Sequence, residues 1–478
     1  MNILLIYPEA PDTFWSFRAA LKFISKKSSE PPLGLITIAG LLPSSWNKKL
    51  VDMNVSALSD SQIRWADYVF LSGMNVHLKS MKEVIGRCKK LGAKIVLGGP
   101  YCTVDSQEFE DVDHLVLNEA EITLPMFLRD LENGNPKHVY QSGEFPDLSL
   151  TPQPAWELLE KDKYSCMSVQ YSRGCPYNCE FCAITVLNGR RPRTKSKEQF
   201  IGELESLYQF GWTGSVFIVD DNFIGNKIKL KKEILPALIE WGESCGFPFN
   251  YTTEVSINLS DDEELVELMA RAGFDHAFVG IETTNEDSLT ECGKSQNKQR
   301  DLVAFIVGFD NDPPNIFQQQ IRFIQKSGIV TAMVGLLNAP SGTRLYERLK
   351  RENRLLKVMS GNNTDGSTNF IPKMDYHKLI EGYREIIHTI YSPAAYYERV
   401  KTFISDYRKV KLATPIRIQP HDVRALFKSF WVLGAREKGR RFFWKLLLFS
   451  LLKYPQNFPL AVRMAIYGFH FRQVSQTI

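Results

Sequence analysis

Short apolar runs alternate with amphipathic stretches over the first 130 residues of the chain. Each run is bounded by turn residues, and the stretch "HLKSMKEVIGRCKKLG" (77–92) between two of them carries apolar residues at helical spacing. This alternation predicts a parallel sheet covered by helices, a Rossmann-like arrangement. The expected strands cover residues 2–8, 48–55, 66–74, 94–100 and 113–121.

The segments that follow these strands are rich in glycine, proline and small polar residues. They read "YPEAPD", "SGMNV", "GGPYC" and "NEAEIT". Ligands of parallel sheets bind beyond the carboxyl ends of the strands. Small residues at that edge predict that a flat ligand lies close to the backbone.

A second series of strand and helix patterns begins after a proline-bearing connector, "EFPDLSLTPQPAWELL". Helical patterns occupy residues 196–211 and 261–273 between its strands. Repeated βα units with polar strand ends predict a complete or partial barrel of the TIM type, with its chemistry at the carboxyl rim. The expected strands cover 167–172, 215–221, 249–256, 276–282, 304–310 and 331–338.

Strand patterns stop near residue 356, and residues 375–478 read as helical. The expected organisation is therefore a Rossmann-like domain (1–140), a linker (141–163), a partial barrel (164–355) and a helical region (356–478). Residues 421–478 are basic and rich in aromatic residues and leucine, with Asp422 and Glu437 as their acidic residues. This composition fits either a helical cap over the barrel or a surface that approaches a membrane.

The composition is that of a globular protein and gives no sign of a nucleic-acid-binding, secreted or membrane-spanning protein. Hydrophobic residues make up 44% of the 478 residues and charged residues 23%, as in globular proteins. A formal net charge of +4 gives no reason to expect a nucleic-acid partner. The start of the chain lacks a signal-peptide pattern, and no apolar run approaches the roughly 18–20 residues of a membrane span. We expect a cytoplasmic protein whose eight cysteines stay reduced.

Three of these cysteines, Cys175, Cys179 and Cys182, lie in "YSRGCPYNCEFC". Structural zinc sites use four protein ligands, yet no further cysteine or histidine follows before Cys245. Three thiolates on a four-iron cluster would instead leave one iron open to a small molecule. Core cysteines do not cluster in this way, so the pattern favours a metal or iron–sulfur site, with zinc as the weaker alternative.

Acidic residues stand at the ends of three successive barrel strands. Asp220 and Asp221 follow one strand, and Glu254 and Glu282 end the next two. Such carboxylates suit ribose hydroxyls or an amino group, and the alternatives are a helix N-cap, loop solvation or a surface salt bridge. A basic loop near the cysteines fits a cofactor carboxylate, a redox partner or plain solvation, and contains Arg190, Arg191, Arg193 and Lys195.

C-x3-C-x2-C after the first strand of a βα barrel resembles the signature of the radical S-adenosylmethionine (SAM) superfamily. In that family the three cysteines hold a [4Fe–4S] cluster, SAM chelates the fourth iron, and reductive cleavage yields a 5′-deoxyadenosyl radical. The resemblance implies that Cys175, Cys179 and Cys182 bind the cluster. It also implies that SAM is bound by Phe181, Asp220, Asp221, Glu254 and Glu282, although members often carry Gly-Gly-Glu where this chain has the aspartate pair.

The domain order resembles the cobalamin (B12)-binding radical SAM enzymes, with matches in "LLIYPEAPDTFW", "PPLGLITIAGLLP", "GGPYCT" and "VDHLVLNEAEITLP". No Asp-x-His-x-x-Gly sequence occurs, so no histidine ligand for cobalt is expected. The alternative is a domain of this type that binds no cobalamin. By resemblance, the cobalamin-binding residues are Pro8, Ser72, Gly98, Gly99, Pro100 and Glu119.

A subgroup that includes the hopanoid C-2 methylases shares "EFPDLSLTP", "ITVLNGRRPRTKSKEQ", "VDDNFIGNK" and "GLLNAPSGTRLYERLKRE". The resemblance implies a methyltransferase that acts on an unactivated carbon, with SAM as both radical source and methyl donor. It further implies a small-molecule or hopanoid-like lipid substrate and an electron donor such as flavodoxin or ferredoxin. Peripheral contact at the inner face of the membrane, through the C-terminal region, would follow.

One departure from the subgroup lies before Phe305. The stretch "GKSQNKQRDLVAFIVGFD" is shorter than in relatives by roughly 15–20 residues, about one helix and part of a strand. A missing crossover should disturb the strand order or leave a gap in the barrel. The alternatives are therefore another radical SAM reaction, such as cyclisation, oxidation or epimerisation, or a non-catalytic iron–sulfur or cobalamin-binding protein.

Overall fold

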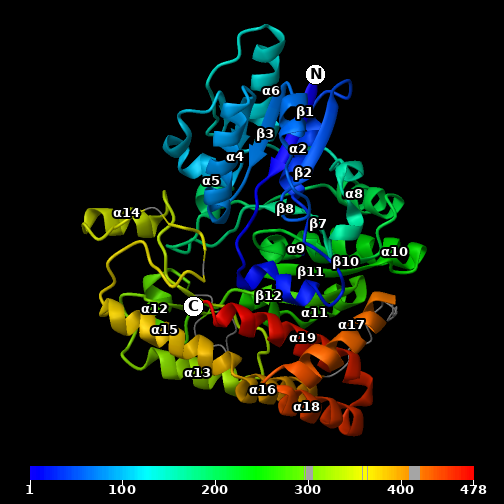
Figure 1. Cartoon of the computed structure of the whole chain (residues 1–478), viewed down its shortest axis with the longest axis vertical. Helices are drawn as coiled ribbons and strands as arrows, with labels where there is room; N and C mark the ends of the chain where they lie inside the picture. The colour runs from blue at the N-terminus through cyan, green and yellow to red at the C-terminus, as the bar shows by residue number, and fades with distance from the viewer. Residues whose placement is uncertain (295–296, 298–304, 358, 363, 408–419) are drawn as a thin grey trace.

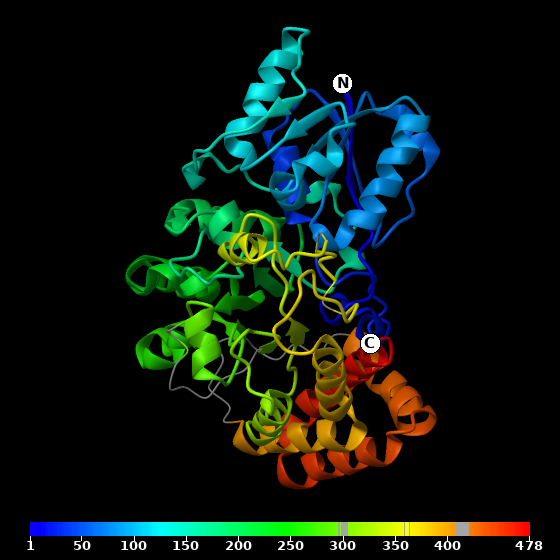
Figure 2. The ribbon, with the colours of Figure 1, turned by 90° about the vertical axis from the view of Figure 1, so that its left-hand side faces the viewer.

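The computed structural model describes residues 1–478 except 295–296, 298–304, 358, 363 and 408–419. The N-terminal sheet lies at one end of the molecule, the second parallel sheet lies in the middle, and the C-terminal helices lie at the other end (Figure 1). A quarter turn about the vertical axis shows the same order of regions (Figure 2). The expected α/β architecture with a helical C-terminal region is confirmed.

The N-terminal sheet is parallel throughout, in the order β2-β1-β3-β4-β5-β6. The order reverses between β1 and β3, which creates a crevice at the carboxyl edge of the sheet. All five expected strands are present, and a short sixth extends the edge. Their bounds are β1 Asn2–Tyr7, β2 Asn47–Asp52, β3 Tyr68–Ser72, β4 Lys94–Gly98, β5 His114–Val116 and β6 Val139–Tyr140.

Both faces of this sheet are buried because its central strands are apolar at consecutive positions. In β1, Leu4 and Ile6 face the core beneath α4, whereas Ile3 and Leu5 face the core beneath α2 and α6. Side chains along a strand point alternately to the two faces, so one short run serves two cores. The helices are α2 Leu33–Leu41, α3 Asp60–Trp65, α4 Leu78–Lys90, α5 Pro100–Val104 and α6 Ala120–Glu132.

The central region holds a four-stranded parallel sheet, β12-β11-β10-β7, and a separate parallel pair, β13 and β14. The sequence does not predict the short antiparallel pair of β8 and β9, whose two strands are connected by the cysteine-containing loop and α7. The strands are β7 Met167–Val169, β8 Ser172–Arg173, β9 Arg193–Thr194, β10 Gly214–Ile218, β11 Phe249–Val255, β12 Phe274–Val279, β13 Phe305–Val307 and β14 Val334–Leu336. The helices are α7 Ile184–Leu187, α8 Lys197–Gln209, α9 Lys227–Lys229, α10 Leu235–Cys245, α11 Glu263–Ala272, α12 Glu286–Glu291 and α13 Ile316–Lys326.

Most of the shortened stretch before Phe305 lies outside the described residues. On either side of it, a single parallel bridge between Glu282 and Phe305 joins the four-stranded sheet to the pair β13–β14. The strands thus keep their sequential parallel order. The interruption reduces the ladder at this point to one bridge among the residues that the structure describes.

The C-terminal helices are α14 Arg344–Arg351, α15 Tyr376–Tyr391, α16 Pro393–Asp406, α17 Pro420–Trp431, α18 Arg440–Lys453 and α19 Phe458–Ser475. The apolar faces of α15 to α19 pack with β13, β14 and α13 in one large core, whereas α14 packs into a smaller core through Leu345 and Leu349. Within the described part of the chain, none of the helices combines the length and apolar character needed to cross a bilayer.

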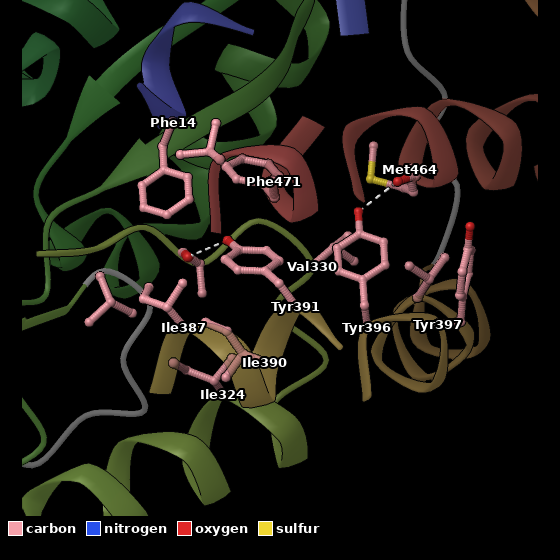
Figure 3. Packing of buried hydrophobic residues seen from close by; sticks show 14 of the residues in the cluster. Phe14, Ile324, Val330, Ile387, Ile390, Tyr391, Tyr396, Tyr397, Met464 and Phe471 are labelled. Carbon is pink, nitrogen blue, oxygen red and sulfur yellow. Dashed lines mark hydrogen bonds between the residues drawn. The ribbon is translucent and has the colours of Figure 1, made fainter. Parts of the chain in front are cut away.

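An N-terminal segment belongs to this C-terminal core. Phe14 and Phe23, which flank α1 (Arg18–Leu21), are buried against α19 and its neighbours. Figure 3 shows Phe14 beside Phe471 and Tyr391, whose ring centroids lie 5.6 and 5.9 Å from that of Phe14. The imidazole of His470 also makes a 3.1 Å hydrogen bond with the carbonyl of Phe14. The start of the chain therefore spans all three regions.

Candidate active site

The cysteine triplet lies on the loop between β8 and α7, at the carboxyl end of β7. Gly174 opens this loop with φ +93°, and a Cβ there would stand 2.9 Å from the carbonyl oxygens of both Asn188 and Arg191. Glycine is therefore required for the loop to turn so tightly beneath the segment after α7. All three cysteines are half-buried.

Two side chains that follow β10 hold the loop. The Asp221 carboxylate accepts hydrogen bonds from the Gly174 N–H at 2.7 Å and from the Asn188 amide at 3.0 Å. The Asn222 amide lies 4.0 Å from the sulfur of Cys175. Sequence reasoning did not single out Asn222, although it stands directly after the aspartate pair.

The thiols suit a cluster rather than a free nucleophile. Burial raises the pKa of all three, that of Cys182 to about 12, so they are protonated until metal binding displaces the protons. Among the described residues, no three His, Cys, Asp or Glu side chains converge as they would around one metal ion. A four-iron cluster needs a wider arrangement, because each thiolate binds a different iron. Three soft ligands on one short loop fit that group.

Helix α14, which is far from the cluster loop in the sequence, clamps that loop. The Arg348 guanidinium contacts Glu180 at 2.8 Å, Asp310 at 2.8 Å and Glu291 at 3.2 Å. Arg344 donates to the carbonyl of Asn178 at 2.8 Å. Because Glu180 stands between Cys179 and Cys182, the position of the loop depends on this network of charges.

We expect Arg348→Gln to weaken cluster retention by about 10–100-fold, the usual cost of losing a residue that orients ligands. The neutral side chain would remove the counter-charge that Glu180 and Glu291 share, while Asp310 would keep its ion pair with Arg354. Iron release to a chelator measures the effect. Arg351→Gln, on the exposed side of the same helix, is the matched control and should behave as the wild type. Equal iron release from the two variants would contradict a clamping role.

A cavity of about 960 Å³ lies between the carboxyl edges of the two parallel sheets. Residues at the ends of β1, β3, β4 and β5 line one side, and residues at the ends of β7, β10 and β11 line the other. Ile184, Leu187 and Phe217 give it an apolar wall close to the cluster loop. The cavity is therefore large enough for extended ligands and touches both domains.

Most of the residues expected to bind cobalamin line this cavity. Ser72, Gly98, Gly99 and Pro100 do so at the ends of β3 and β4. Gly99 has φ +95°, and a Cβ there would lie 2.2 Å from the Ser72 hydroxyl oxygen. A ligand can therefore approach the backbone at a place where any side chain would intrude. This small-residue floor fits the flat cofactor that the sequence predicts.

Pro8 differs from that expectation. It is buried, and its carbonyl accepts a 3.2 Å hydrogen bond from the Asn54 amide. Its neighbours Tyr7 and Ala10 line the cavity instead. Pro8 is absent from the lining of this cavity, and its contact with cobalamin stays a prediction.

Glu119 lines the cavity but is also the centre of an inter-domain ion pair. Its carboxylate lies 2.7 Å from both Arg173 and Arg193, and Glu121 binds Arg173 at 2.8 Å. These groups are mostly buried, with side-chain exposures between 3% and 15%. The main partners of Glu119 are therefore two arginines of the barrel, which fix the N-terminal sheet over the cluster loop.

The four acidic residues expected at the ends of the barrel strands, Asp220, Asp221, Glu254 and Glu282, fall into two pairs. Asp221 and Glu254 line the cavity, and burial raises the pKa of Glu254 to about 7. Asp220 points away and accepts the N–H of Tyr171 at 2.8 Å. Glu282 is paired with the buried Lys294. Since Asp220 and Glu282 already have internal partners and are absent from the lining, the structure provides no contact between them and a ligand in this cavity.

Two further cavity residues escaped sequence reasoning. Glu30, just before α2, lines the cavity, and burial raises its pKa to about 7. His77 also lines it, and burial lowers its pKa to about 4, so the imidazole is neutral. The His77 Nδ1 accepts the N–H of Met74 at 3.1 Å. Neither residue belongs to a recognisable motif.

Phe181 and the basic loop complete the site. The Phe181 ring lies 6.2 Å from that of Phe309, in a small core beside the cluster loop. Of the basic residues, Arg193 pairs with Glu119, and Lys195 is buried with Glu203. Arg190 and Arg191 remain exposed beside the loop.

Three family models match successive parts of the chain. The B12 binding domain matches residues 23–128 and the radical SAM superfamily matches residues 169–337. A domain of unknown function matches residues 343–478, which include the helix that clamps the cluster loop.

Full-length relatives and a solved structure agree with these matches. An uncharacterised methyltransferase of Synechocystis is 39% identical, with 100% of this chain and 92% of the relative covered. The hopanoid C-2 methylase of Rhodopseudomonas palustris is 31% identical over 95% of this chain and 90% of its own length. The radical SAM methyltransferase TsrM of Kitasatospora setae, solved with cobalamin and a [4Fe–4S] cluster, shares the fold with a TM-score of 0.56 at 14% identity, covering 80% and 84% of the two chains. The chain belongs to the radical SAM enzymes that carry a B12-binding domain, a family that uses a [4Fe–4S] cluster, SAM and cobalamin.

Proposed function

We propose that the protein is a cobalamin-dependent C-methyltransferase that acts on an unactivated carbon of a polycyclic, hopanoid-like lipid. The observation that carries the proposal is the cavity shared by the two domains. It joins the small-residue floor of the B12-binding sheet to the rim of the radical SAM sheet. The two reactive centres would therefore face a single substrate.

The chain's own residues divide the work. Cys175, Cys179 and Cys182 would hold the cluster. Asp221 and Glu254 place carboxyl groups in the cavity, and the positive charge of SAM would favour their ionised forms. When bound, the cofactors supply a 5′-deoxyadenosyl radical for hydrogen abstraction and a methyl group for transfer.

The B12-binding edge and the cavity wall have separate tasks in this proposal. Ser72, Gly98, Gly99 and Pro100 would form the floor beneath cobalamin. The apolar wall at Ile184, Leu187 and Phe217 suits a hydrocarbon substrate and keeps water from the reacting carbon.

The proposed partners follow from this chemistry. Reductive cleavage of SAM needs a one-electron donor, and a flavodoxin or ferredoxin carries the acidic surface that would match the exposed Arg190 and Arg191. A hopanoid-like substrate resides in a bilayer, so we propose peripheral contact with the inner face of the membrane. The 31% identity to a hopanoid C-2 methylase over nearly the whole chain supports the choice of substrate class.

The test is an anaerobic assay with reconstituted cluster, cobalamin, a strong reductant, a hopanoid and SAM deuterated in its methyl group. We expect a hopanoid that gains one deuterated methyl, together with 5′-deoxyadenosine and S-adenosylhomocysteine. Formation of 5′-deoxyadenosine without a methylated product from any hopanoid would favour a different radical SAM reaction. An intact cluster that cleaves no SAM would favour a non-catalytic binding protein.

A further inference from the structure

Two C-terminal helices present large apolar side chains to solvent. On α17, Phe427 is 66% exposed and Trp431 is 58% exposed; on α18, Leu448 is 56% exposed and Leu452 is 81% exposed. Both helices lie at the end of the molecule away from the N-terminal sheet (Figures 1 and 2). We call this the α17–α18 surface, and its apolar members are Val423, Phe427, Trp431, Trp444, Leu448, Leu451 and Leu452.

The exposed residues follow one stripe on each helix. Val423, Phe427 and Trp431 are spaced by four residues, as are Leu448 and Leu452, so each set lies on one side of its helix. The opposite sides are buried in the C-terminal core, through Ala425, Phe443, Leu446 and Leu447. These helices therefore cap the barrel with one face and leave a second apolar face without cover from the described residues.

Aromatic rings join the two stripes. The ring centroid of Phe430 lies 6.5 Å from that of Phe427 on its own helix and 5.6 Å from that of Trp444 on α18. The Trp444 indole also donates to the carbonyl of Gly434 in the connection between the helices, at 2.9 Å. The stripes thus form one continuous surface held by direct contacts.

The charges on the two helices of this surface are mostly basic, with Asp422 as an exposed acidic residue on α17. Arg436 stacks over Trp431 at 4.8 Å from the ring centroid. Glu437, an acidic residue of the same stretch, is engaged by Arg472 at 2.9 Å and does not offset the exposed cations. The exposed basic side chains of the two helices and their connection are Arg424, Lys428, Arg436, Lys438, Arg440, Arg441, Lys445 and Lys453.

We propose that the α17–α18 surface docks on an anionic lipid bilayer. Tryptophan, phenylalanine and leucine on one face, bordered by lysine and arginine, form the pattern of helices that lie in the plane of a membrane interface. Each basic side chain near an anionic surface adds to the attraction. A second copy of the chain fits poorly, because pairing would bring two basic surfaces together. The inference deepens the proposed function, since it states how the enzyme would reach a lipid substrate.

The experiment is co-sedimentation of the full-length protein with large vesicles. One set contains phosphatidylcholine alone and the other contains phosphatidylcholine with phosphatidylglycerol. We expect binding to the anionic vesicles to be at least about tenfold tighter, and to weaken as salt screens the basic residues. The double variant Leu448→Glu and Leu452→Glu should lose at least about tenfold in affinity for the anionic vesicles, because it places carboxylates where apolar side chains enter the interface.

The matched control is Ile228→Glu, which changes an equally exposed apolar residue, 69% exposed, on the distant helix α9. It should bind vesicles as the wild type does. Equal binding of the double variant and the wild type, or no binding of the wild type to either vesicle, would overturn the proposal. A concentration-dependent dimer that the double variant abolishes would show instead that the surface pairs with a second copy.

A second readout separates this inference from the proposed substrate. If both are correct, the double variant methylates a hopanoid dispersed in detergent at the wild-type rate but loses activity on a hopanoid embedded in anionic vesicles. Vesicle binding without methylation of any hopanoid would reject the substrate class and leave the docking surface standing.

Discussion

Replacement of Cys179 by alanine is expected to abolish both cluster assembly and the formation of 5′-deoxyadenosine. Two thiolates cannot hold a four-iron cluster on this loop. The thiol of Cys292 is nearby, but it is buried outside the loop and donates to the carbonyl of Leu289, so it does not replace Cys179. Iron and sulfide content after anaerobic reconstitution should fall to a residual level. SAM cleavage should fall to that of a protein-free control.

Cys245→Ala is the matched control for this change. Cys245 is also half-buried, but it ends α10 and lies outside the cluster loop. It should retain full iron content and full SAM cleavage. A Cys179→Ala protein that still cleaves SAM would reject the assignment of the triplet as the cluster site.

The second large effect is expected at Gly99. Valine at this position would collide with Ser72 and push a branched side chain into the cavity floor. We expect Gly99→Val to lose cobalamin, measured by absorbance of the bound cofactor, while the cluster loop keeps its iron. If the Gly99→Val protein keeps its iron, it is folded, and its loss of cobalamin is then due to the change in the cavity.

A variant at a second glycine, Gly92, serves as the control for backbone strain. Gly92 has φ +71°, similar to the +95° of Gly99, but a Cβ there would meet nothing within 4 Å. Gly92→Val therefore places a branched side chain at a positive φ without reaching the cavity. If both variants bind cobalamin equally well, the floor at Gly99 is not the cobalamin site.

The sequence predicts the fold well because most of the signal is local. Buried strands such as Asn2–Tyr7 and Phe249–Val255 are continuous or alternating apolar runs, and helices such as Glu263–Ala272 have clear periodicity and caps. The antiparallel pair β8–β9 is not predicted because its strands contain two residues each, too few to show any period.

The sequence predicts the candidate site only in part, because the side chains of neighbouring residues at a strand end point in opposite directions. Asp220 and Asp221 are equivalent in the sequence, yet one holds the backbone of Tyr171 and the other lines the cavity. Contacts between distant residues carry no local pattern at all. Arg348 meets Glu180 across 168 positions, and only the folded chain reveals that pair.

The placement of Phe14 and Phe23 in the C-terminal core has a consequence for biosynthesis. During translation these rings emerge first, yet α19, which covers them, is made last. The segment around Phe14 and Phe23 therefore stays uncovered until almost the entire chain has been synthesised. All strands of the N-terminal sheet, in contrast, are available much earlier. A ribosome stalled before residue 458 would present these aromatic residues to chaperones. The separately expressed B12-binding domain would likewise carry an uncovered apolar segment, so cutting this enzyme into its domains should promote aggregation.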